Sequence, residues 1–202
     1  MRLSQIFSLL VIFAVMNACA YRFQGSENPW REKSVENVYI NIMTNNSLRA
    51  GEEVPFTSAF LKTFSRGNKL KVVNDSKQAD IVVNATIESI ASNVSSSTNV
   101  PTLTQDKLAS QTISDMVIAT EYAATATVSV QLTKGEASTN PKLPPILLVQ
   151  NFSRVKIYPG NSQFGLPGST SVLINDSQFQ MALNEIAQGI AADAYDTMLE
   201  YF

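Results

Sequence analysis

The 202-residue chain contains no histidine and only one cysteine. Without histidine it cannot form a Ser-His-Asp triad, a Cys-His dyad or a histidine-ligated metal site. A single cysteine excludes an internal disulfide and any paired-cysteine redox or zinc motif. Lys and Arg number 15 against 17 Asp and Glu, a balance that argues against nucleic acid binding, which requires clustered cations. With 45% apolar and only 16% charged residues, the chain is expected to fold around a core as one domain.

The single cysteine, Cys19, follows a short apolar segment near the N-terminus. Residues 6–16 are apolar-rich and uncharged, and Arg2 precedes them. As a helix they would span about 16 Å, roughly half of a bilayer core of ~30 Å, which fits a signal peptide better than a membrane span. Ala18 then stands directly before the cysteine, as in a bacterial lipobox. This position predicts cleavage before Cys19 and acylation of its side chain and amino group, palmitate included.

Lipidation at Cys19 predicts how the chain is divided into segments and where in the cell it is located. Residues 1–18 are expected to form a lipoprotein signal peptide, residues 19–34 a lipidated tether and residues 35–202 a single domain. Ala20, where an Asp would indicate the inner membrane, points to the outer membrane. More than one acyl chain gives stable anchoring. An ordinary secretory signal with an incidental cysteine is the alternative.

Hydrophobic periodicity predicts an α+β fold with one mixed or antiparallel sheet of about four strands and two helices packed on one face. One helix is expected from Glu52 to Gly67, where the glycine adopts the left-handed conformation. A second is expected from about Asp176, with one continuous apolar stripe. Strands are predicted over 38–43, 81–92, 122–132 and 146–157, with a short strand start at 70–73.

Two features of the predicted sheet bear on its surroundings. Ser, Thr and Asn alternate with the apolar residues of the long strands, so the second face of the sheet is expected to meet water or a partner. The Ser/Thr-rich residues 92–111 are expected to form either a long hairpin loop or an unpaired strand extension.

Two residue pairs have a spacing that catalysis sometimes uses. Ser153 and Lys156 match the SxxK spacing of Ser-Lys acyl enzymes, but in a strand these positions face opposite sides of the sheet. Glu52 and Glu53 are adjacent at a helix start, where they favour the positive end of the dipole and do not face one another. Neither pair makes a convincing enzyme site.

Charge is distributed unevenly along the chain. The segment from Asp176 to the C-terminus carries five acids and no base. Three of these acids, Asp193, Asp196 and Glu200, share one side of the predicted helix. They favour a solvated acidic face over a metal site, because a ligand from a further element and a confining loop are both lacking. Cations on the strands either contact an anionic lipid headgroup or protect a sheet edge from aggregation.

The order of these elements and several short motifs resemble the LptE family of lipopolysaccharide-assembly lipoproteins. Residues 19–25 read Cys-Ala-Tyr-Arg-Phe-Gln-Gly, which is similar to the CGYxFxG start of mature members. Residues 78–87 look like the ADAVLxGxI strand of the family, and residues 122–130 look like its next long strand. The sequence differs in having Ala20 where the family has glycine, and in its long connection over 92–121.

This resemblance implies a non-enzymatic outer-membrane lipoprotein without a metal or other cofactor. Family members sit inside the LptD β-barrel, on the periplasmic side and in its lumen. They plug the barrel, help it to assemble and bind lipopolysaccharide during transport to the outer leaflet. Lys134 and Lys142 are the nearest candidates for lipopolysaccharide contact in this sequence. A lipoprotein that regulates a periplasmic cell-wall synthase and a lipid-anchored hydrolase using Ser153 and Lys156 are the alternatives.

Overall fold

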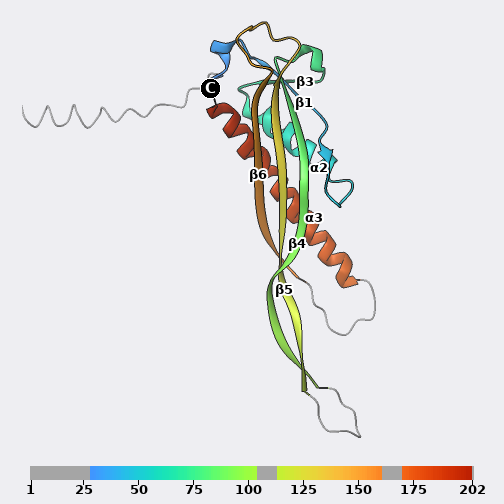
Figure 1. Ribbon diagram of the computed structural model, residues 1–202. Coiled ribbons are helices and arrows are strands. Elements are labelled where there is room, and N and C mark those ends of the chain that lie inside the picture. The colour runs from blue at the N-terminus through green and yellow to red at the C-terminus, as the bar shows by residue number, and fades with distance from the viewer. Residues whose placement is uncertain (1–27, 104–112, 161–169, 202) are drawn as a thin grey trace, which may run out of the picture.

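A six-stranded mixed sheet is covered on one face by two helices in the computed structural model, which describes residues 28–103, 113–160 and 170–201 (Figure 1). This confirms the predicted α+β class, although the sheet has six strands and not about four. The strand order is β3-β1-β4-β5-β6, with β2 also paired to β4. β1 pairs in parallel with β3 and β4, whereas β4, β5 and β6 are antiparallel. The elements are η1 (Arg31–Lys33), β1 (Asn37–Ile40), β2 (Thr44–Asn45), α2 (Glu53–Gly67), β3 (Lys71–Val73), η2 (Ser76–Gln78), β4 (Ile81–Leu103), β5 (Ile113–Lys134), β6 (Ile146–Pro159) and α3 (Thr170–Glu200).

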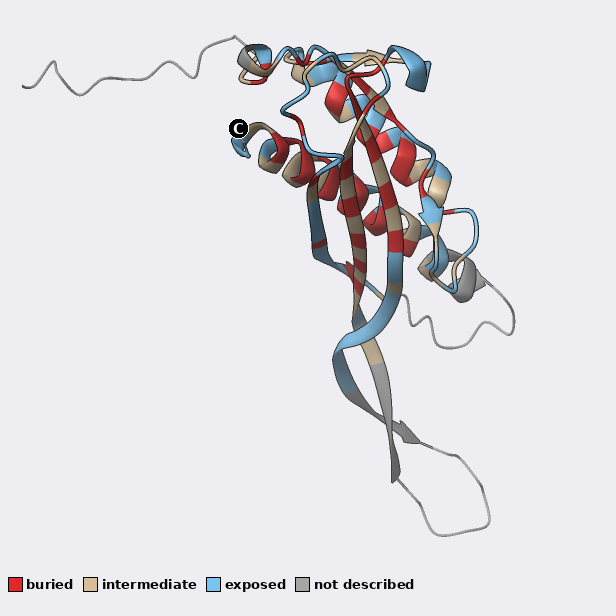
Figure 2. Cartoon of the chain, turned by 45° about the horizontal axis from the view of Figure 1, so that its top comes forward, coloured by how far each residue is buried: buried red, intermediate tan, exposed pale blue. Residues whose placement is uncertain are grey.

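The apolar faces of the two helices form the core with one face of the sheet. Phe56, Phe60 and Phe64 recur at every fourth position of α2 and are buried. The predicted apolar stripe of α3 is confirmed from Phe179 to Met198, all of its members being buried. Alternate residues of β4 and β5 lie beneath these helices, as the strand period of two requires. Figure 2 shows this burial confined to the half of the sheet that lies against the helices.

The β4–β5 hairpin is the longest feature of the sheet. Its register runs from Ile81 opposite Lys134 to Leu103 opposite Ile113. The expectation that residues 92–111 form a loop or an unpaired extension is therefore wrong for residues 92–103, which are paired, while residues 104–112 lie outside the described chain. Three register shifts between Ile87 and Ser97 interrupt the ladder, and such bulges increase strand twist. The far part of the hairpin extends beyond the helices (Figure 1).

The opposite end of the molecule, here called the proximal end, gathers η1, η2, β3 and the loop 135–145 (Figure 1). Trp30 is fully buried there, and its Nε1 donates a hydrogen bond to the carbonyl oxygen of Met198 at 3.2 Å. Asn140 in the loop donates through Nδ2 to the carbonyl oxygen of Lys33 at 3.0 Å. The start of the described chain is thus held against the last turns of α3 and against this loop.

Candidate interaction surfaces

The sheet face opposite the helices, here called the open face, is lined mainly by polar, uncharged side chains over its central strands. On β5 its side chains are half-buried hydroxyl and amide groups, namely Thr125, Thr127, Ser129, Gln131 and Thr133. Asn84 on β4 donates through Nδ2 to Thr133 Oγ1 at 3.3 Å, and Thr127 Oγ1 donates to Ser153 Oγ at 3.1 Å. These bonds link three strands side by side. In the described chain both long helices pack on the other face, so the open face is left for water or a partner.

Strand β6 adds exposed apolar side chains to the open face on either side of Asn151 and Ser153, and these apolar residues are here called the β6 stripe. Val149, Val155 and Ile157 are 60%, 62% and 54% exposed. The register places Val155 opposite Thr125, so the stripe borders the polar centre of the face. Among the described residues no strand pairs with the outer edge of β6. An exposed apolar edge strand is prone to aggregate unless it is covered, so these residues favour a protein partner on this surface.

The cations of β6 point to the other side of the sheet and form ion pairs with α3. Arg154 donates through Nε and Nη2 to the two carboxylate oxygens of Asp193, each at 2.7 Å. This pairing lowers the pKa of Asp193 and raises the pKa of Arg154. Lys156 Nζ lies 2.5 Å from a carboxylate oxygen of Glu185. Both cations join the sheet to the helix. This role differs from the two predicted from the sequence, contact with a lipid headgroup and protection of a sheet edge.

The structure separates the two residues of the SxxK pattern. Ser153 accepts the hydrogen bond of Thr127 on the open face, whereas Lys156 pairs with Glu185 on the helix face. The serine and lysine of an acyl enzyme must be neighbours, so this arrangement does not support a hydrolase. Asp193 is engaged with Arg154, and no group of three His, Cys, Asp or Glu suited to a metal ion occurs in the described part of the chain.

Glu52, at the start of α2, holds the preceding loop against α3. Its carboxylate is buried and accepts hydrogen bonds from Arg49 Nε and Gln180 Nε2, both at 2.9 Å. Arg49 also reaches Asp176 of α3, at 2.6 Å. The side chain of Glu53 turns back to the loop and does not face Glu52; its hydrogen bond from Asn45 lowers the pKa of its carboxyl. The two carboxylates therefore stabilise the fold through separate sets of hydrogen bonds.

The residues predicted from the sequence to contact lipid are placed as follows. Cys19 lies outside the described residues, so its acylation stays a prediction. Lys134 and Lys142 both lie at the proximal end. Lys134 Nζ donates to the carbonyl oxygen of Asn140 at 2.7 Å, and Lys142 is exposed in the loop that follows. Their contact with lipopolysaccharide also stays a prediction.

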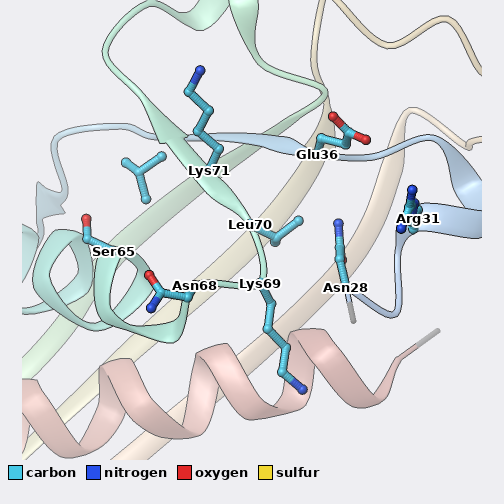
Figure 3. A pocket seen from close by; sticks show the side chains of 9 residues that line it. Asn28, Arg31, Glu36, Ser65, Asn68, Lys69, Leu70 and Lys71 are labelled. Atoms are coloured by element: carbon cyan, nitrogen blue, oxygen red, sulfur yellow. The ribbon is translucent and has the colours of Figure 1, made fainter. Parts of the chain in front are cut away.

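A pocket of about 680 Å³ opens at the proximal end, between η1, the end of α2 and β3. Its cationic lining residues are Arg31, Lys69 and Lys71, and Glu36 is the one acid among them in the described chain (Figure 3). No motif in the sequence marks this pocket. Lys69 and Lys71 on either side of the buried Leu70 are the only local signal for it.

Comparison with known proteins gives one family and several distant structures. A family model described as LptE, lipopolysaccharide-assembly, matches residues 35–198. No curated protein matches the chain. In the described segments, no helix is both long and apolar enough to cross a membrane.

Three solved structures show how distant the similar folds are. Rare lipoprotein B from Shewanella oneidensis is 12% identical, with 79% of this chain and 95% of that chain covered and a TM-score of 0.40. The minor lipoprotein from Acinetobacter baumannii is 12% identical, with 82% and 96% covered and a TM-score of 0.38. The hypothetical protein CT253 from Chlamydia trachomatis is 12% identical, with 79% and 95% covered and a TM-score of 0.44.

Proposed function

The chain belongs to the LptE family of non-enzymatic lipopolysaccharide-assembly lipoproteins, because the family model covers residues 35–198, and we propose that it plugs an LptD-like outer-membrane β-barrel. In this role it occupies the barrel lumen from the periplasmic side and helps the barrel to assemble. It binds lipopolysaccharide during transport to the outer leaflet, with Lys134 and Lys142 as candidate contacts. Residues 1–18 act as the signal peptide, and acylated Cys19 anchors the chain to the outer membrane.

The open face and its β6 stripe are the observation that supports a barrel partner. A β-barrel lumen is lined by polar side chains, and hydroxyl and amide groups form hydrogen bonds with such a wall without burying a charge. Val149, Val155 and Ile157 are exposed beside an unpaired strand edge, in the described chain, and a partner that covers them removes this apolar area from water. The geometry therefore fits a protein that works enclosed by another.

Co-purification tests this proposal. The acylated chain, carrying a C-terminal affinity tag, is isolated from detergent-solubilised outer membranes, and its partners are identified by mass spectrometry. We expect a large β-barrel protein in a stable stoichiometric complex, with lipopolysaccharide retained. Recovery of a cell-wall synthase and no barrel protein would instead favour the alternative of a synthase regulator.

A further inference from the structure

We propose that the basic pocket, defined by Arg31, Lys69 and Lys71, is a docking surface for the anionic phospholipid headgroups of the leaflet that anchors the chain. The inference rests on the proposed lipid anchor at Cys19. It adds to the proposed function a second contact with the membrane, made by the folded domain itself and separate from the contact with lipopolysaccharide.

The cations of the pocket are only partly offset by acids in the described part of the chain. Arg31 comes from η1, while Lys69 and Lys71 flank the start of β3. Within the described residues none of the three forms an ion pair, in contrast to the cations of β6, which are both paired with α3. Glu36 supplies a single opposing charge at the rim. The described lining of the pocket therefore carries a net positive charge, which attracts an external anion.

The directions of the side chains favour a surface over a single bound anion. Figure 3 shows the side chains of Lys69 and Lys71 extending to opposite sides of the segment that carries them, with Arg31 at a third position on the rim. A site for one phosphate needs donors that converge on one point. Cations that diverge present their charge over an area, as contact with many headgroups requires.

The position of the pocket places it next to the anchor. Asn28, the first described residue, lines the pocket and follows Cys19 by nine residues. A fully extended segment of nine residues spans at most about 30 Å. The 22 residues of β5 extend for roughly 70 Å at ~3.3 Å per residue, so the far end of the hairpin cannot lie as close to the anchor as the pocket does.

Labelling of lysines in the acylated full-length chain tests the inference. The chain is reconstituted in vesicles of phosphatidylcholine alone or of phosphatidylcholine mixed with phosphatidylglycerol. A membrane-impermeant amine-acylating reagent is then added, and the modification rate of each lysine is measured by mass spectrometry. With phosphatidylglycerol, Lys69 and Lys71 should react about fivefold more slowly, and high salt should restore their rates. Lys62, exposed on α2 outside the pocket, is the internal control and should react equally in both vesicles.

A matched pair of variants assigns the effect to the pocket. Arg31→Glu should weaken the protection of Lys69 and Lys71, whereas Lys62→Glu should leave it intact. Equal rates in the two kinds of vesicle, or protection already present with phosphatidylcholine alone, would overturn the inference. Protection that appears only after lipopolysaccharide is added would also overturn it, by assigning the pocket to that lipid.

The outcome is separable from that of the proposed function, because the vesicles contain no barrel protein. Loss of protection with retained co-purification of a barrel refutes the docking surface alone. Protection without any barrel partner refutes the plug alone. Failure of the chain to float with either kind of vesicle refutes the anchor on which the inference rests.

Discussion

Gly67 shows that helix packing decides the residue at which α2 ends. The sequence predicts a left-handed Gly67, but the left-handed residue is Asn68, with φ of 54°, and Gly67 is still helical. A Cβ at Gly67 would overlap the phenol ring of Tyr195 on α3. That ring packs edge-on against Phe64, with ring centroids 5.1 Å apart. The glycine is required for the close approach of two helices, and no local sequence pattern reports that approach.

Replacement of Gly67 by alanine should therefore destabilise the fold by about 1–3 kcal/mol, because the buried Tyr195 ring must move. The measurement is the free energy of unfolding in urea. Ser65→Ala, at an exposed position of the same helix, should change it by less than about 0.5 kcal/mol. Stabilisation by Gly67→Ala, as helix propensity alone would give, would contradict this packing.

At the scale of elements, the Arg154–Asp193 pair joins β6 to α3. Both side chains are more than a third exposed, so solvent screening limits the pair to about 0.5–1 kcal/mol. Because the pairing lowers the pKa of Asp193 below its ordinary value of 3.8, its contribution is complete above that value and is lost as the pH falls through the lowered pKa.

Arg154→Ala should thus lower the free energy of unfolding near pH 7 and make little difference once acid protonates Asp193. Urea titrations of the two proteins across this pH range give the difference. Asp193→Asn should lose a similar amount at pH 7 without this pH dependence. A difference that persists unchanged in acid would show that Arg154 stabilises the fold by packing and not by charge.

Hydrophobic periodicity predicted the helices and strands whose pattern of buried residues repeats along the sequence. It failed where contacts outside that repeat determine the structure. The stripe of α3 and the alternation along β5 were predicted because each residue repeats the same environment. The strand predicted over 38–43 ends at Ile40, and Ile42 is 70% exposed. Asn41 Oδ1 accepts a hydrogen bond from the backbone amide of Ile42, and this local bond competes with strand pairing. Residues 92–103 lack apolar alternation, and their pairing follows from the register of the core half of the hairpin.

Beyond Ser96, where the pairing of β5 with β6 ends, no third strand supports the β4–β5 hairpin among the described residues. A two-stranded ribbon without a packed face is of marginal stability. In the isolated chain, backbone amides of 97–103 should therefore exchange hydrogen faster than those of 81–90, measured by mass spectrometry. Equal protection of the two segments would contradict this difference.

At the scale of the whole molecule, we propose different contacts for two parts of its surface: phospholipid headgroups at the proximal end and a barrel wall at the open face. Alternation in the sequence predicted the polar face, since it depends on a period of two. That β6 would be the edge strand depends on the strand order, and that β3 and η1 would meet depends on the tertiary fold. For this reason the β6 stripe and the basic pocket emerge only in three dimensions, whereas the anchor at Cys19 is a prediction from the sequence alone.

Acylation of Cys19 is checked in cells grown with labelled palmitate. The wild-type chain should incorporate the label and fractionate with the outer membrane, whereas Cys19→Ser should lose both properties. Ala20→Asp should keep the label but shift toward the inner membrane, if sorting follows the residue after the cysteine. Outer-membrane attachment of Cys19→Ser would show that the anchor lies elsewhere.

A barrel wall that covers the open face, as we propose, should distinguish two valines of similar exposure. Val155 on the open face is 62% exposed and Val54 on α2 is 67% exposed, so replacing either by lysine should change the stability of the isolated chain by less than about 0.5 kcal/mol. Burial of an unpaired lysine in an interface should lower barrel recovery with Val155→Lys by about tenfold or more, whereas Val54→Lys should co-purify as the wild type does. Undiminished recovery of the barrel with Val155→Lys would contradict this proposal.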